Sequence, residues 1–214
     1  SWARHVIGGK YGDGNAVVES VACIPNEKNG YDEVWLSVKR TIGGTTRTYI
    51  EYITPILDFD LVGQDEAFFL DCGLTYNGAK TTTVKGLDHL EGEKVSVFAD
   101  GSTHPDRIVT NGSISLQVAS SKVHIGFSYN SDLKTVRPEA GSAQGSAQGK
   151  KKRIYEAVVR LKDTGCVMIG KSFEDMDRIE FRAQDVAMDH PPPLYTGDRS
   201  INPNQGWNKD GQIC

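Results

Sequence analysis

The chain has 214 residues, of which 38% are hydrophobic and 24% are charged. These proportions are typical of a folded globular protein and exclude disorder over most of the chain. The longest apolar runs, such as AFFL at 67–70, are far shorter than the ~20 residues that cross a bilayer. We therefore expect no membrane span.

The formal net charge is −4, from 24 Lys and Arg against 28 Asp and Glu. Tight binding to a polyanion needs clustered cations, so this charge excludes such binding over the whole surface. It leaves room for a local basic patch.

The four cysteines, Cys23, Cys72, Cys166 and Cys214, lack CxxC spacing. This pattern indicates neither a zinc site nor a redox pair, and we expect free thiols from a reducing compartment. The first residue, Ser1, is not preceded by a charged or apolar leader. We therefore expect a trimmed or excerpted chain.

The first third of the chain is predicted to form three strands, at 15–24, 32–42 and 45–54. These segments are rich in Val, Ile, Thr, Tyr and Trp and are separated by PNEKNG and GG. The middle strand alternates, with Val34, Leu36 and Val38 on one face. Residues 1–57 are therefore predicted to form an antiparallel meander that resembles one propeller blade. Such a small sheet needs a neighbour to cover its apolar face, either the rest of this chain or sequence left out.

Short strands continue from residue 65 to about residue 136. The expected strands are 67–76, 81–86, 94–100, 107–118 and 122–129. Asn111 and Gly112 lie between RIVT and SISL, which is the strongest short-range hairpin signal. Residues 58–136 are predicted to form a β-barrel or sandwich domain, so the expected fold class is all-β.

The rest of the chain is predicted to be a loop followed by further strands. The tandem SAQG-SAQG at 142–149 favours a flexible surface loop over 137–153. The segment 151–163 could be a helix or a strand, and its β-branched residues favour the strand. We expect 154–214 to hold the remaining strands and an extended C-terminal segment that completes the β core.

The stretch GLDHLEGEKVSVFADG at 86–101 carries the densest group of proton-transfer or metal-ligand side chains. In an extended segment, three of them would share one face and could hold a metal. However, Gly86 and Gly92 bracket Leu87 and Leu90, a spacing that favours one tight turn with both leucines buried and the acids outside. The dense group comprises Asp88, His89, Glu91, Glu93 and Asp100, and the three that would share one face are His89, Glu91 and Glu93.

No other segment has the pattern of a catalytic site. A GxSxG elbow, a phosphate-binding GxxxxGK[ST] loop and a GxGxxG loop are all absent. The remaining histidines are scattered singly, and each is predicted to be an ordinary surface or hydrogen-bonded histidine: His5, His104, His124 and His190. We expect no catalytic residues, no metal site and no cofactor.

The run KKKR, Lys150, Lys151, Lys152 and Arg153, is the one segment with a plausible role toward a polyanion. Four adjacent cations on a loop could contact phosphates without reading sequence. The alternative is a solvated charged loop. Because no aromatic residue interleaves the run, a stacking platform for single strands is not indicated.

Taken together, several segments resemble a family of phage virion proteins. They include WARH, DEVWLSVKRTI, DEAFFLDCGLTY, GLDHLEGEKVSVFADG, AQGKKKRI, PLYTGD and GWNKDGQI, in this order over nearly the whole chain. The family is the tail nozzle, packaged-DNA stabilisation protein or tail tubular protein B, of short-tailed bacteriophages and prophages. GLDHLEGEKVSVFADG is its most specific motif.

The resemblance implies a structural, non-enzymatic role in the virion, in a protein made in the bacterial host cytoplasm. In this family a propeller-like body precedes further β domains, and six copies form a ring at the distal end of the tail. The ring seals the DNA exit after packaging and lets DNA pass on ejection. The implied partners are further copies in a hexamer, other tail proteins such as an adaptor ring, fibres or a needle, and double-stranded DNA in non-specific transit.

Three departures from the family pattern indicate a C-terminal fragment of a larger subunit. The upstream propeller sequence is absent, the chain stops at Cys214 where another strand is expected, and the SAQG duplication lengthens a loop.

Two other functions stay open at this point. One is a tail adhesion or carbohydrate-binding β-sandwich, which an exposed cluster of Trp2, Trp35, Trp207 and tyrosines would favour. The other is a metal-dependent hydrolase built on 88–93.

Overall fold

The computed structural model describes residues 4–26, 30–53, 63–139, 145–181, 191–203 and 206–214. Trp2, His190 and part of the SAQG repeat lie outside these residues. The described residues form strands and two short 3-10 turns, Gln64–Glu66 (η1) and Asp88–Leu90 (η2). The predicted all-β fold is confirmed. None of the helices in the described part is long and apolar enough to cross a membrane.

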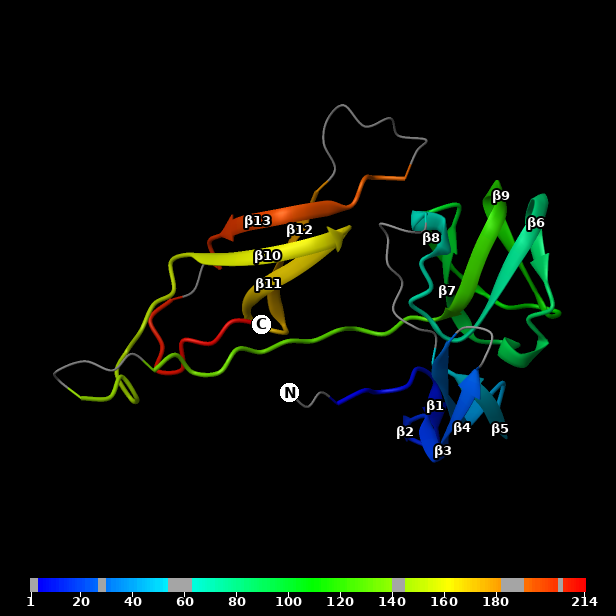
Figure 1. Cartoon of the computed structure of the whole chain (residues 1–214), viewed down its shortest axis with the longest axis horizontal. Coiled ribbons are helices and arrows are strands. Elements are labelled where there is room, and N and C mark those ends of the chain that lie inside the picture. Colours follow the sequence, from blue (N-terminus) through cyan, green and yellow to red (C-terminus); the bar gives the residue numbers. More distant parts are fainter. Residues whose placement is uncertain (1–3, 27–29, 54–62, 140–144, 182–190, 204–205) are drawn as a thin grey trace. The chain divides into compact units, whose positions relative to one another are not determined.

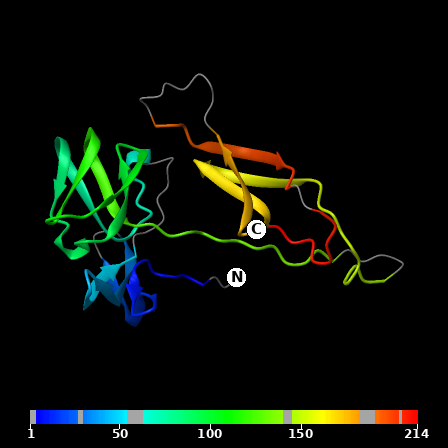
Figure 2. The same ribbon diagram turned by 180° about the vertical axis from the view of Figure 1, so that it is seen from behind.

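The chain forms two compact units, Ser1–Asn130 (unit 1) and Ser131–Cys214 (unit 2). Figures 1 and 2 show their strands from opposite sides. The predicted division into 1–57, 58–136, 137–153 and 154–214 stays a prediction. Each unit is described below by itself.

Unit 1 begins with a short hairpin, β1 (Lys10–Tyr11) and β2 (Gly14–Asn15), and continues into the predicted meander. The meander is β3 (Val17–Asn26), β4 (Tyr31–Ile42) and β5 (Thr45–Tyr52), paired antiparallel in that order. Gly43 and Gly44 make the turn between β4 and β5, and both have positive φ angles of 55° and 77°. A two-residue turn of this kind needs positive φ at both positions, which glycine adopts without strain.

The second sheet of unit 1 has the order β6-β9-β7-β8. Its strands are β6 (Asp71–Lys85), β7 (Lys94–Ala99), β8 (Ser102–Ile108) and β9 (Ser113–Phe127). The sequence predicts two short strands in the region of β6, which is a single strand. It likewise predicts two short strands in the region where β9 continues unbroken to Phe127. Register shifts along the β6–β9 pair bend these long strands without ending them.

The predicted Asn-Gly turn joins β8 to β9. Asn111 and Gly112 have φ angles of 52° and 60°, and Thr110 bridges to Ser113. The hairpin prediction is confirmed, because both central residues adopt the left-handed conformation that this turn requires.

The core of unit 1 is built mainly from the second sheet and η2. Its buried members are Ile42, Val84, Leu87, Leu90, Val95, Val97, Val109, Ile114, Leu116, Val123 and Ile125. Ile42 belongs to β4, and Tyr49 of β5 packs against the same cluster. The meander therefore finds the neighbour that it was predicted to need within this chain, at the end where β4 turns into β5.

Unit 2 consists of two two-stranded antiparallel sheets. β10 (Ala157–Thr164) pairs with β13 (Tyr195–Ile201), and β11 (Cys166–Ser172) pairs with β12 (Asp175–Glu180). The strand prediction for 151–163 is confirmed from residue 157 onward. At the C-terminus, Cys214 exchanges two backbone hydrogen bonds with Gly170 of β11, at 3.0 and 3.1 Å.

Candidate functional site

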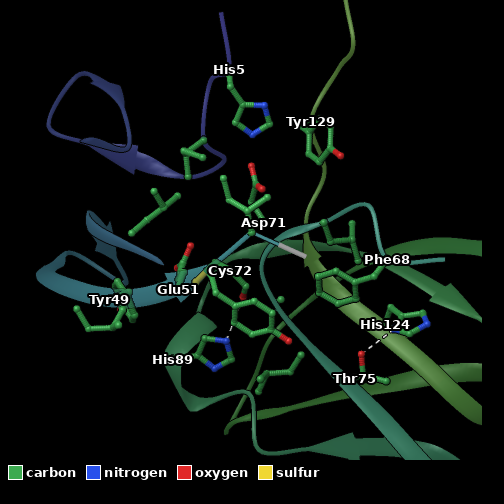
Figure 3. Close-up of a pocket in the computed structure, with 18 of the residues that line it drawn as sticks. His5, Tyr49, Glu51, Phe68, Asp71, Cys72, Thr75, His89, His124 and Tyr129 are labelled. Atoms are coloured by element: carbon green, nitrogen blue, oxygen red, sulfur yellow. Dashed lines mark hydrogen bonds between the residues drawn. The ribbon is translucent and has the colours of Figure 1, made fainter. Parts of the chain in front are cut away.

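A cavity of about 710 Å³ lies within unit 1, against β5 and the start of β6 (Figure 3). Its size falls in the range of small-molecule pockets. Aromatic and aliphatic side chains contribute most of its surface, among them Tyr49, Phe68 and Tyr129. Polar groups that also face it are His5, Glu51, Asp71 and His89.

A backbone segment is held at the cavity by four residues, which we term the Gly8 clasp: Gly8, Arg40, Glu51 and Asp71. The Gly8 N–H donates to Asp71 Oδ2 at 2.6 Å, and the Gly8 carbonyl accepts from Arg40 Nε at 2.7 Å. Arg40 has no exposed surface and forms a two-point ion pair with Glu51. A charge this deeply buried requires such a partner, because desolvation otherwise costs several kcal/mol.

Burial changes the proton affinity of the groups in the cavity wall. It raises the pKa of Asp71 above its ordinary value, although the bond from Gly8 acts in the opposite direction. Burial also raises the pKa of the Cys72 thiol to about 12. Since the thiolate is the nucleophilic form, Cys72 is unsuited to nucleophilic catalysis at neutral pH.

Both histidines on the β6 side of the cavity are engaged in structural hydrogen bonds. His89 Nε2 donates to the Cys72 carbonyl at 3.2 Å. His124 Nε2 donates to the Asp65 carbonyl at 2.8 Å, so its Nδ1 accepts from the Thr75 hydroxyl at 2.7 Å (Figure 3). Both ring nitrogens of His124 are therefore hydrogen-bonded, which agrees with the sequence interpretation of a hydrogen-bonded histidine.

Residues 86–93 of the acid-rich stretch form the predicted turn, which leads into β7. Leu87 and Leu90 are 1% and 0% exposed, and the exposed carboxylate of Glu91 caps the Asn-Gly turn. Glu91 accepts from the backbone N–H groups of Asn111 at 2.9 Å and Gly112 at 2.7 Å.

Asp100, at the other end of this stretch, also supports the fold. It accepts from the backbone N–H groups of Ser121 and Lys122 and from the Ser121 hydroxyl. Within the part of the chain that the structure describes, no three His, Cys, Asp or Glu side chains are grouped to hold a metal. The stretch therefore connects neighbouring strands.

The predicted basic run lies in unit 2, and its four members differ in position. Lys150, Lys151 and Arg153 are exposed, whereas Lys152 is half-buried. Lys152 and Asn208 exchange backbone hydrogen bonds of 2.6 and 2.9 Å, and Lys152 Nζ donates to the Lys209 carbonyl at 3.3 Å.

This bridge brings a fifth cation, Lys209, beside the run. The acid next in sequence, Asp210, is paired with Arg137 at 2.9 Å and is not free to neutralise the run. Among the described residues, none of Lys150 to Arg153 makes an ion pair. We term Lys150, Lys151, Lys152, Arg153 and Lys209 the basic segment.

Sequence reasoning missed the cavity and the Gly8 clasp. One signal was present, because Arg40 continues the inward-facing alternation of Leu36 and Val38. A cation at an inward position of a strand indicates a buried partner. Nothing in the sequence identified Gly8, Glu51 and Asp71 as that partner set, nor Lys209 as a neighbour of Lys152.

All four cysteines carry free thiols, two of them exposed, Cys23 and Cys166.

Comparison of the chain with protein-family models and with curated proteins gives no match.

Proposed function

We propose that this chain is a structural, non-enzymatic part of a phage tail protein, in a nozzle ring that retains packaged DNA and lets it pass on ejection. The observation that carries the proposal is the basic segment of unit 2. Lys151 and Arg153 flank the anchored Lys152, and alternation along an extended backbone directs them away from it. The backbone is fixed while the charged side chains stay available.

The charge distribution suits transient contact with a duplex. Each phosphate neutralised contributes about −0.9 to the slope of log K against log salt, so the four exposed cations of the basic segment give about −3.6. This is weak compared with the slope of about −10 of a tight DNA-binding protein. The net charge of −4 repels DNA elsewhere on the surface. In a ring of copies, sparse basic segments would hold DNA reversibly.

The charge contribution can be measured by titrating duplex DNA with the protein at several salt concentrations. Lys151→Glu with Arg153→Glu is expected to reduce the salt slope by about 1.8, because two phosphate contacts are lost. Lys80→Glu with Lys85→Glu, two exposed cations of β6, makes the same charge change elsewhere. Equal effects of the two double variants would refute a specific role of the basic segment.

The assembly can be tested by imaging the full subunit in negative stain. A six-fold ring with the basic segment facing an axial channel is the expected result. The proposal fails if the segment lies on the outer surface of the ring, or if the full subunit is strictly monomeric.

A second candidate function, a tail adhesion or carbohydrate-binding module, is favoured by the outer face of the meander. The rings of Trp35 and Tyr52 lie 5.3 Å apart, and Trp35 Nε1 donates to Glu33 at 3.1 Å. An aromatic surface beside a carboxylate is suited to a sugar ring. Calorimetric titration with oligosaccharides would detect such binding, and a Tyr52→Ala variant with unchanged heats would exclude this face.

A further inference from the structure

The sheets of unit 1 end in edge strands that differ in how their edges are protected. β6 has three register shifts along its pairing, and β8 contains Pro105 with the charged Asp106 and Arg107. Shifts, prolines and charges are features that prevent an edge from pairing with another chain. β3 has one shift at Glu19 and Pro25 near its end. Its segment 20–24, SVACI, has none of these features.

β3 also exposes apolar side chains on both of its faces. Val17 and Ile24 lie on the face shared with Lys39 and Glu33, whereas Val18 and Val21 lie on the opposite face. The exposed fractions of these four β3 residues range from 38% to 61%. Apolar residues on both faces are typical of a strand with neighbours on all sides.

The residues beside β3 in the same sheet are covered. Val38 and Leu36 of β4 are 0% and 7% exposed, whereas their partners Val18 and Val21 are 38% and 61% exposed. The cover provided by unit 1 therefore ends at β4. The backbone groups on the far side of residues 20–24 of β3 pair with no strand among the described residues.

The opposite edge of this sheet is also open, and its exposed apolar side chains lie at the end that follows Arg47. β5 pairs only with β4 in the described part of the chain (Figure 1). Its Ile50 and Tyr52 are 68% and 51% exposed, and Ile53, which continues the pairing to Val34, is 50% exposed. One three-stranded sheet thus has two open apolar edges.

We propose that β3 of one copy of this chain pairs with β5 of a second copy, so that the meander sheets of neighbouring copies join edge to edge. An unpaired strand edge is recognised by another extended strand, because only a strand satisfies its row of N–H and C=O groups. A second copy is the partner that covers both open edges by one kind of contact. Pairing of β3 with another β3 would leave β5 open.

Such a contact is heterologous, since different surfaces of the two copies meet. Heterologous contacts generate rings when the rotation closes and open chains when it does not. β3 and β5 both run antiparallel to β4 and therefore share one direction, so copies in the same orientation would pair in parallel. The pairing gives the proposed tail assembly its subunit contact and in that respect rests on the proposed function.

Cross-linking of singly substituted chains tests the pairing. Ser20 of β3 and Ile50 of β5 both pair with Ser37, so they face the same side of the sheet at the same level. Within one chain they are two strand spacings apart, about 9.6 Å, which is too far for a disulfide. Ser20→Cys and Ile50→Cys chains, each with Cys23 and Cys166 replaced by serine, are mixed and oxidised.

A disulfide between the Ser20→Cys chain and the Ile50→Cys chain is the expected product. Ala22→Cys, one pleat further along the same face, replaces Ser20→Cys to allow for a two-residue stagger. Disulfides only between two β3 variants would overturn the proposal, and so would the absence of any mixed product at both positions.

Association of the otherwise unmodified full chain provides a second test. Val21→Lys places a charge in the unprotected segment and is expected to raise the concentration for half-association at least tenfold, as measured by light scattering. Val118→Lys, at a valine of β9 that is 70% exposed, is the matched control and is expected to leave association unchanged. Equal association of both variants, or a strictly monomeric parent chain, would overturn the proposal.

The outcome is separable from that of the tail proposal. A mixed disulfide together with DNA binding that does not depend on the basic segment would retain the edge contact and refute the DNA role. DNA binding that depends on the basic segment, without a mixed disulfide, would retain the DNA role and refute the edge contact.

Discussion

The two units of the chain differ in how much apolar surface they bury. Unit 1 has a continuous core of eleven buried side chains. In the described part of unit 2, Ile169 is the only buried hydrophobic side chain. Two-stranded sheets are marginally stable by themselves in water. The difference indicates that unit 1 is stabilised by its own packing, whereas unit 2 depends mainly on backbone pairing.

The two units can be followed separately, because each contains one described tryptophan. Trp35 lies in unit 1 and Trp207 in unit 2. With Trp2 replaced by phenylalanine, variants that retain one of the two report the unfolding of a single unit.

Removal of the Glu51 carboxylate from the Gly8 clasp is expected to have the largest effect on the stability of unit 1. Glu51→Gln removes the ion-pair partner of the buried Arg40 charge, which costs about 3–5 kcal/mol of unfolding free energy. Urea unfolding monitored at Trp35 measures the loss. Arg40→Met combined with Glu51→Leu is expected to recover much of it, and a small loss from Glu51→Gln alone would contradict the clasp.

Truncation of the core is expected to be nearly as costly. Leu90→Ala removes a side chain with no exposed surface from the cluster, at a cost of about 2–5 kcal/mol. The transition monitored at Trp35 is expected to move to lower urea, while the transition at Trp207 stays in place. A shift of both transitions would show that the two units unfold together. It would refute the proposed difference between the stabilisation of unit 1 and that of unit 2.

Loss of the turn cap is expected to be smaller. Glu91→Ala removes two charge-assisted hydrogen bonds to the backbone at Asn111 and Gly112, where water can substitute in part. We expect a loss of about 1.5 kcal/mol. Asp32→Ala, an exposed acid of β4 away from this turn, is the matched control.

Truncation of the buried Ile169 in unit 2 is expected to cost less unfolding free energy than Leu90→Ala in unit 1. Ile169→Ala lacks a dense surrounding core, so we expect a loss of about 1 kcal/mol, below the range for a packed core. Urea unfolding monitored at Trp207 provides the value. A loss equal to that of Leu90→Ala would show that unit 2 contains a core of its own.

The pH dependence of unit 1 is expected to contain two opposing contributions. The pKa of Asp71 is raised in the folded state, so its contribution destabilises as pH rises from 3.8 through the folded pKa. Burial acts to raise the pKa of Asp100 as well, but hydrogen bonds from Lys122 and Ser121 outweigh it and lower that pKa. The stability from Asp100 is therefore present above 3.8 and is lost as pH falls.

Two variants separate these contributions. Asp71→Asn is expected to reduce the loss of stability on raising pH above 4, and Asp100→Asn to reduce the loss on lowering pH below 4. Unfolding curves between pH 2 and pH 6, monitored at Trp35, measure both. Identical pH profiles of the two variants would contradict the assigned directions.

Local features of the fold could be predicted from the sequence, because nearby residues determine them. The spacing of Leu87 and Leu90 between two glycines predicted a turn with both leucines buried, and Asn111 with Gly112 predicted the hairpin. The lengths of β6 and β9 could not be predicted, since the bulges that continue them depend on the partner strand.

The candidate sites were less predictable for the same reason. Lys150 to Arg153 are adjacent in the sequence, but the anchor of Lys152 lies 56 residues further on, at Asn208. The Gly8 clasp joins residues 63 positions apart. A sequence pattern identifies such a set only when all of its members fall in one segment.

The Gly8 clasp has a mechanical consequence. Gly8 lies just before β1, and Phe127 ends β9, the last strand of unit 1; a β-carbon at Gly8 would be 2.9 Å from that of Phe127. The rings of His5 and Tyr129 are also in contact, at 5.8 Å. Because the segments before β1 and after β9 lie together, tension applied along the chain is borne by these contacts and by the two hydrogen bonds to Gly8. The core strands would be loaded only after the clasp has opened.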